Sequence, residues 1–173
     1  HSNFRANLEP IEKEAAKYLK WERFVHPIRF LSLVPLSHVF GQFMGMFIPM
    51  HLGGEVYFRD SFHAQQAIET IKRHRISVLV AVPRMLDSRR QRIQRDQLAG
   101  SFRRELERAL TEPVALRWIR FRRIHNQLGW KFWAVISGGA PLSAETEEFF
   151  RALGFAVLQG YGMTETASVI SIP

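Results

Sequence analysis

The chain has 173 residues, of which 46% are hydrophobic, and a formal net charge of +8 at pH 7. This length suits one domain or part of a larger one, and the apolar fraction is ample for a packed core. No uninterrupted apolar run reaches the roughly 18 residues that a membrane-spanning helix needs. Because the sequence has no cysteine, disulfides and thiolate metal sites are excluded.

The first part of the chain alternates between helical and strand-like patterns. Apolar residues recur at helical spacing over residues 3–21, and a buried strand is expected at Phe30–Val34. The apolar run Phe43–Leu52 is predicted to be a buried helix because it is too long for a typical strand. The next strand is Glu55–Phe58. Three methionines of the apolar run are expected in the core: Met44, Met46 and Met50.

The same alternation continues to the end of the sequence. Ala64–His74 has the pattern of an amphipathic helix, and Ile76–Val82 is a β-branched strand. A further strand is expected at Lys131–Ile136. Ser143–Leu153 is a predicted helix with a serine cap, acidic residues near its start and a glycine just after its end. Phe155–Leu158 is the last predicted strand.

Most of the positive charge lies between Arg84 and Arg123, where twelve arginines stand against five acidic residues. We expect this stretch to be largely helical, with a break near Pro113. A solvated helical face interleaved with glutamates is the favoured interpretation. Contact with an anionic membrane surface is the first alternative, and nucleic-acid binding is the less favoured second one.

The alternation of helices and strands predicts an α/β fold with a mostly parallel sheet flanked by helices. In such sheets, ligands bind beyond the carboxyl ends of the strands. Three loops that contain glycine or histidine follow predicted strands and should therefore share one edge of the sheet: Pro35–Gln42, Ser137–Leu142 and Gln159–Thr166.

The last of these loops combines two glycines with hydroxyl groups and a carboxylate. Gly160 and Gly162 allow a sharp turn or the close approach of a ligand to the backbone. Thr164 suits a phosphate, whereas Glu165 would repel one unless a divalent cation lay between them. The loop therefore indicates a Mg²⁺-nucleotide site, although a plain polar loop carries about equal weight on these residues alone.

The loop that begins at Ser137 strengthens this interpretation. It is built of small residues, which leave room for a flat group against the main chain. By itself, this loop would be interpreted as an ordinary turn without a ligand. Because it precedes the glycine-containing loop by one strand, the two loops should be neighbours, with Tyr161 facing Gly139 and Ala140 across a slot in which an adenine could lie.

The two loops together resemble the adenylate-forming (AMP-binding) superfamily. The resemblance lies in the sequence Ser-Gly-Gly-Ala-Pro-Leu-Ser at 137–143 and in Gln-Gly-Tyr-Gly-Met-Thr-Glu-Thr at 159–166. Pro35–Gly41 is similar to a third motif of that family, and His1–Asn3 is similar to the segment after its phosphate-binding loop. Val82–Leu86 favours the fatty acyl-CoA synthetase branch.

The resemblance implies that the parent protein is an acyl-CoA synthetase, an AMP-forming acid–thiol ligase. A carboxylic acid, expected to be a medium- or long-chain fatty acid, reacts with ATP to give acyl-AMP, and coenzyme A then displaces AMP. The implied catalytic residues are Thr164 on the α-phosphate, Glu165 on Mg²⁺ and His38 beside the acyl pocket. The implied nucleotide-binding residues are Gly138, Gly139, Ala140, Pro141, Gly160, Tyr161, Gly162, Met163 and Thr164.

Several alternatives stay open. His38 could simply end a strand and cap the next helix. An aryl acid or a carrier-protein thiol could replace the fatty acid and coenzyme A. The arginine-rich helices could make the protein a non-catalytic module that binds a lipid surface or nucleic acid. The other histidines show no metal spacing and are expected at surface or boundary positions: His26, His51, His63, His74 and His125.

The resemblance also implies that residues 1–173 are a single fragment of the large N-terminal domain, without the phosphate-binding loop and the C-terminal domain of the family. We therefore expect this chain alone to be inactive in adenylation. The parent is expected in the cytoplasm, with peripheral membrane contact as an option and no nucleic-acid partner.

Overall fold

The computed structural model describes residues 27–59, 64–96, 99–161 and 169–171. Its described strands form one six-stranded sheet in the order β2-β1-β3-β4-β5-β6. All neighbouring strands are parallel except β5 and β6, which are antiparallel. The predicted α/β class with a mostly parallel sheet is confirmed. The strands are β1 (Arg29–Ser32), β2 (Glu55–Phe58), β3 (Val78–Ala81), β4 (Ala134–Gly138), β5 (Ala156–Tyr161) and β6 (Val169–Ser171).

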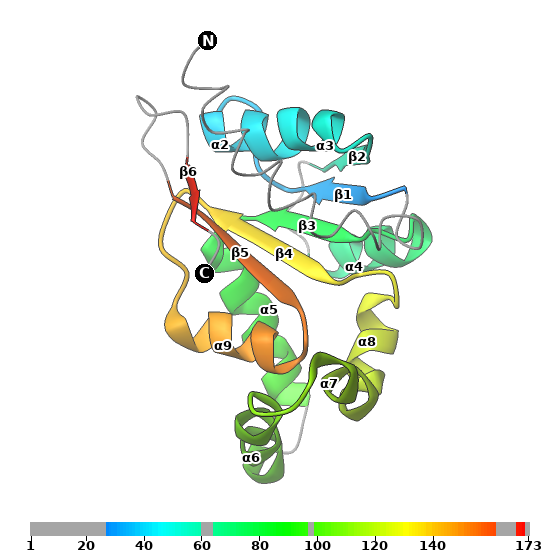
Figure 1. Cartoon of the computed structure of the whole chain (residues 1–173), viewed down its shortest axis with the longest axis vertical. Coiled ribbons are helices and arrows are strands. Elements are labelled where there is room, and N and C mark those ends of the chain that lie inside the picture. The colour runs from blue at the N-terminus through cyan, green and yellow to red at the C-terminus, as the bar shows by residue number, and fades with distance from the viewer. Residues whose placement is uncertain (1–26, 60–63, 97–98, 162–168, 172–173) are drawn as a thin grey trace.

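Helices cover both faces of the sheet (Figure 1). One face carries a continuous helical segment made of α2 (Val39–Gln42), the π-helical turn η1 (Phe43–Phe47) and α3 (Ile48–His51). The other face carries α4 (Ala64–Arg73), α5 (Pro83–Asp96), α8 (Arg122–Leu128) and α9 (Ala144–Ala152), with α6 (Ala99–Ala109) and α7 (Val114–Arg120) further from the sheet.

Two apolar cores, one on each face, follow from the alternation of side chains along the strands. In β1, Phe30 packs into the core under α2 and η1, whereas Leu31 packs into the core under α5 and α9. In β4, Val135 and Ile136 divide in the same way. Strands that are buried on both faces are mostly apolar, and in β1 and β4 the buried exceptions are Ser32 and Ser137.

Most strand bounds differ by one or more residues from the sequence prediction. β1 is Arg29–Ser32 where Phe30–Val34 was expected, and β3 is Val78–Ala81 where Ile76–Val82 was expected. β4 begins at Ala134 and not at Lys131, and β5 continues through Gly160 to Tyr161, where a loop was predicted. The extension has a structural cause, because β5 pairs with β4 as far as Gly160 on one side and with β6 on the other. Strand β6 was not predicted.

The apolar run 43–52 was predicted correctly as helical, but only part of it is core. Phe43 and Met44 are buried, whereas Met46 and Met50 are exposed, so the expectation that all three methionines are core residues was wrong. An amphipathic helix buries only the side that contacts the sheet. The predicted helix at 3–21 lies outside the described residues.

The arginine-rich stretch is helical as predicted, and α7 begins directly after Pro113. Proline suits this position because its fixed φ and missing N–H favour the start of a helix over its interior. None of the helices among the described residues is long and apolar enough to cross a bilayer.

Candidate functional site

The predicted site lies at the carboxyl edge of the sheet, where β4 and β5 end. Gly138 in β4 stands directly beside Gly160 in β5. A Cβ atom added to Gly138 would lie 2.3 Å from Cε2 of Phe40, and one added to Gly160 would lie 2.6 Å from the same atom. The two glycines therefore form a shallow groove in the sheet that the ring of Phe40 fills. Phe40 belongs to α2, so the last part of the predicted Pro35–Gln42 loop is helical, and this contact brings α2 to the ends of β4 and β5.

The loop after Gly138 is open to ligands. Gly139 has a φ of 83°, a conformation that favours glycine, and within the described part of the chain no atom lies within 4 Å of the position that a Cβ would take. Ala140 and Pro141 are exposed, and Leu142 is buried and anchors the end of the loop. Small residues thus form this surface, and its predicted contact with a flat ring stays a prediction.

A network of polar side chains fixes the point where this loop enters α9. Ser143 caps the helix by accepting a hydrogen bond from the N–H of Thr146 at 3.3 Å, and its hydroxyl donates to Asp87 of α5 at 3.1 Å. The hydroxyl of Thr146 donates to the same Asp87 oxygen and accepts from Nε of Arg90 at 2.9 Å. Arg90 also pairs with Glu145. The network ties α5 to the start of α9.

The other end of α9 is held by aromatic side chains. Trp118 of α7 donates from its indole nitrogen to the carbonyl of Gly154 at 3.1 Å, and Nε2 of His125 in α8 bonds the carbonyl of Leu153 at 2.9 Å. The two rings are stacked, with centroids 4.0 Å apart. The bond to Leu153, the C-cap residue, satisfies a carbonyl group that the helix leaves unpaired, and the bond to Gly154 holds the turn that follows.

His125 corrects one sequence prediction, because it is completely buried and was expected at a surface or boundary position. Burial lowers the pKa of its imidazole, against a smaller opposing effect of the hydrogen bond to Leu153. The ring is therefore neutral at pH 7, with its hydrogen on Nε2, since a carbonyl oxygen only accepts. His74 is half-buried and His51 is exposed, as predicted, whereas His26 and His63 lie outside the described residues.

His38 occupies the N-cap position of α2, and its exposed side chain makes no capping hydrogen bond. Its backbone carbonyl accepts from the N–H of Gln42 at 3.0 Å. His38 therefore stands at the N-cap position, but its side chain does not cap the helix. The described residues contain no cluster of three or more histidine, aspartate or glutamate side chains that could hold a metal ion.

Four of the predicted site residues lie outside the described residues: Gly162, Met163, Thr164 and Glu165. Tyr161 is placed as the last residue of β5, next to Gly160, and only its backbone is described. Three roles therefore stay predictions: the stacking of Tyr161 on adenine, the phosphate contact of Thr164 and the Mg²⁺ contact of Glu165. The described residues establish one wall of the site, made by Gly138–Pro141 and Gly160.

Three residues that support the site were missed in the sequence. Phe40 was treated only as part of a motif, although paired glycines on neighbouring strands require a large side chain to fill the space above them. Asp87 and Thr146 carried no recognisable pattern, because they are 59 residues apart in the sequence and meet only through the packing of α5 on α9.

Solved structures share this fold. The unliganded O-succinylbenzoate coenzyme A synthetase of Bacillus subtilis is 26% identical, with a TM-score of 0.54, and the match covers 83% of this chain and 24% of that one. The same enzyme in complex with ATP and magnesium ion matches with a TM-score of 0.53. The N-terminal domain of FACL13 from Mycobacterium tuberculosis, at 23% identity and a TM-score of 0.55, supports the fold alone.

Curated relatives point to the same group of proteins. Long chain acyl-CoA synthetase 1 of Arabidopsis thaliana is 29% identical over 84% of this chain and 24% of its own length. The long-chain-fatty-acid–CoA ligase ACSBG2 of Gallus gallus is 25% identical over 83% of this chain and 22% of its own length. The chain thus spans about a quarter of these relatives. The family model described as AMP-binding enzyme matches residues 1–173, and the chain belongs to this family.

Proposed function

We propose that the protein to which this chain belongs is an acyl-CoA synthetase that activates a medium- or long-chain fatty acid with ATP. The observation that carries the proposal is at the carboxyl edge of the sheet, where Gly138 pairs with Gly160 under Phe40 and the exposed small residues Gly139–Pro141 follow directly. Membership of the AMP-binding family and the names of the long-chain relatives support the fatty acid as substrate.

The proposed reaction has two steps. A carboxylate oxygen of the fatty acid attacks the α-phosphorus of ATP, and pyrophosphate leaves with the electron pair of the broken P–O bond. The sulfur of coenzyme A then attacks the acyl carbonyl, AMP leaves, and the thiol proton passes to solvent. Such chemistry depends mainly on positioning the reactants and on neutralising phosphate charge.

The chain's own residues would contribute positioning. The adenine would lie against the exposed backbone of Gly139 and Ala140, where the structure leaves open space. Thr164 would donate a hydrogen bond to the α-phosphate. Glu165 would hold Mg²⁺, whose charge would offset that of the phosphates. His38 would border the acyl pocket as a gate. We propose that residues 1–173 alone are inactive, since they span about a quarter of the matched relatives.

The main test is acyl-CoA formation by the full-length protein with fatty acids of medium to long chain. Glu165→Gln should strongly reduce the rate, and unchanged activity in this variant would contradict the proposed Mg²⁺ role of Glu165. No acyl-CoA formation by the full-length protein with any of these acids would favour a non-catalytic module. Gly160→Ala should also reduce kcat/KM, because its Cβ would collide with Phe40. The double variant Phe40→Leu/Gly160→Ala should regain part of the loss, since the smaller side chain vacates that space.

A second proposal concerns contact with a membrane surface. Val114, Leu116 and Ile119 of α7 are large apolar side chains that are exposed, and Arg122 and Arg123 follow them closely. Apolar residues next to cations suit the interface of an anionic lipid bilayer. Cosedimentation of the full-length protein with anionic vesicles should fall in Ile119→Glu, and binding that is unaffected by this change would contradict the proposal.

A further inference from the structure

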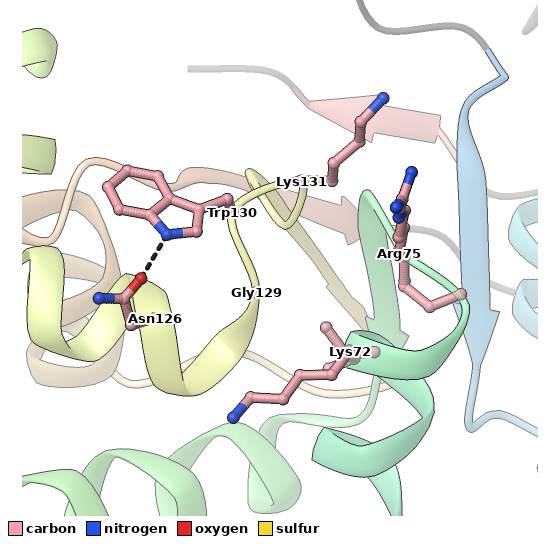
Figure 2. A pocket seen from close by; sticks show the side chains of 8 residues that line it. Lys72, Arg75, Asn126, Gly129, Trp130 and Lys131 are labelled. Atoms are coloured by element: carbon pink, nitrogen blue, oxygen red, sulfur yellow. Dashed lines mark hydrogen bonds between the residues drawn. The ribbon is translucent and has the colours of Figure 1, made fainter.

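An open pocket of about 370 Å³ lies at the amino-terminal ends of β3 and β4 (Figure 2). The surface formed by Gly138–Pro141 and Gly160, which we call the glycine wall, lies at the carboxyl edge of the same sheet. It is formed between the end of α4 and the turn that joins α8 to β4. Ile71 and Ile76, both buried, contribute its apolar floor. Because Ile76 and Lys131 shortly precede β3 and β4, the pocket is separate from the proposed adenylate site at the other ends of these strands.

The polar lining of the pocket is cationic. Lys72, Arg75 and Lys131 all line it, and within the described part of the chain none of them forms an ion pair with a carboxylate. Figure 2 shows Arg75 and Lys131 pointing the same way at one end, whereas Lys72 extends along the opposite side. Positive charge that has no partner in the protein favours an anionic ligand.

The backbone of Arg75 gives independent evidence. Arg75 donates its N–H to the carbonyl of Lys72 at 3.3 Å, and Ile76 donates to the carbonyl of Ile71 at 2.9 Å. These two bonds close α4 in a Schellman motif, whose left-handed position is usually glycine. Arg75 holds it with a φ of 51°, the sole positive φ of a non-glycine residue in the described part of the chain. Strain of this kind is often retained at functional sites.

Helix electrostatics explain only part of this charge. Cations in the last turn of a helix complement its negative end, which accounts for Lys72 and for Arg73 beside it. The same effect does not require an arginine in the left-handed position, where glycine would cost less. It also does not explain Lys131, which comes from a different segment. A function for Arg75 and Lys131 therefore has to be sought in what they bind.

Trp130 adds a flat apolar surface to the pocket. Its side chain is 57% exposed, although indole rings are mostly buried in folded proteins. The indole nitrogen donates to the side-chain oxygen of Asn126, which fixes the orientation of the ring (Figure 2). A fixed and exposed indole suits stacking against a ring or packing against an acyl or glyceryl group.

We propose that this pocket binds a phosphate-bearing ligand, with the phosphate between Arg75 and Lys131 and an apolar or aromatic part against Trp130. A guanidinium and an ammonium group supply the charge-assisted hydrogen bonds that phosphate oxygens accept. A soluble nucleotide and the head group of a phospholipid both fit this chemistry. The proposal does not depend on the acyl-CoA synthetase activity, because the pocket and the glycine wall lie at opposite edges of the sheet.

The test measures binding to the full-length protein by titration calorimetry, with uridine 5′-monophosphate as the probe and uridine as the uncharged control. Arg75→Gly is the decisive variant, since glycine removes the guanidinium and also relieves the backbone strain. We expect at least tenfold weaker binding of the nucleotide together with an unchanged or higher melting temperature. Lys131→Gln should weaken binding similarly, whereas Arg73→Ala, a neighbouring exposed cation outside the pocket, should not.

Two further measurements are needed. One distinguishes a lipid head group from a soluble nucleotide as the ligand, and the other distinguishes this pocket from the proposed adenylate site. Vesicles containing phosphatidic acid, compared with phosphatidylcholine alone, test the lipid head group. If the vesicles bind, if their binding is weakened by Arg75→Gly and if uridine 5′-monophosphate does not bind, the pocket is a site for a lipid head group. Gly160→Ala should leave nucleotide binding in this pocket unchanged. Equal binding by wild type and Arg75→Gly, or binding of neither probe, would overturn the proposal.

Discussion

The two ends of helix α9 are fixed by different chemistry, although both lead into the candidate site. At the N-terminal end, Ser143 and Thr146 join a hydrogen-bonded network with Asp87 and Arg90. At the C-terminal end, the rings of Trp118 and His125 stack and bond the carbonyls at the turn into β5. The first end therefore depends on directional polar contacts and the second on packed apolar area.

This difference indicates how each end serves the site. The N-terminal network fixes Ser143, the residue that follows the loop after β4, and residues 139–141 of this loop are exposed. By contrast, Gly160 is held by β5, which pairs with β4 along its length. Loss of the polar network should therefore weaken ligand binding more than it lowers the stability of the fold. Loss of the aromatic contacts should lower the stability of the fold more than it weakens ligand binding.

The largest effect is expected at the C-terminal end. Trp118→Ala removes a ring that stacks on His125 and lies 6.1 Å from the ring of Phe155, together with the hydrogen bond to Gly154. It should lower the free energy of unfolding by about 3–5 kcal/mol, as measured by chemical denaturation. Trp118→Phe keeps much of the apolar area and should cost clearly less. Equal losses in both variants would mean that the hydrogen bond, and not packing, holds this end.

At the N-terminal end, Thr146→Val keeps the size of the side chain but removes its hydroxyl. Arg90 and Asp87 each lose a buried partner, so the free energy of unfolding should fall by about 1–3 kcal/mol. In the full-length protein the KM for ATP should rise more than in Trp118→Phe. Thr146→Ser, which restores the hydroxyl, should recover the ATP affinity. A normal KM in Thr146→Val would show that the loop does not need this network.

The two ends should also differ in their response to pH. Burial lowers the pKa of His125 in the folded state, whereas in the unfolded chain it returns to about 6.5. Below that pH the unfolded chain binds a proton that the folded protein does not, so stability falls by at most about 1.4 kcal/mol per pH unit until the folded pKa is reached. Denaturation midpoints of His125→Phe should therefore decline less than those of wild type between pH 7.5 and 5, roughly the span of this titration. Parallel curves would contradict a neutral buried His125.

The smallest effect is expected for the helix cap. Ser143→Ala removes the acceptor for the N–H of Thr146 and one donor to Asp87. Loss of an N-cap of this kind costs about 1 kcal/mol. Thermal unfolding should show a small decrease, and Ser143→Thr should be close to wild type. A decrease in stability as large as that of Thr146→Val would mean that Ser143 contributes as much to the network as Thr146 does.

Much of the fold could be predicted because local rules and tertiary structure agree. The strand at Glu55–Phe58 and the capped helix after Ser143 were found at or near their observed bounds. The exposed Met46 and Met50 and the buried His125 were not, because periodicity shows that a helix has an apolar side but not how much of it the sheet covers. The site loops were recognised from motifs, yet the side chains that support them come from distant segments.

The sequence by itself determined the α/β class and the resemblance that the family match confirmed, because these depend on short segments with a strong local pattern. Only the tertiary structure decided that Phe40 fills the space above Gly138 and Gly160, that Arg90 and Thr146 meet, and that Arg75 stands in a left-handed position beside Trp130. The physical reason is that these features arise from the packing of segments distant in sequence, which no local pattern records.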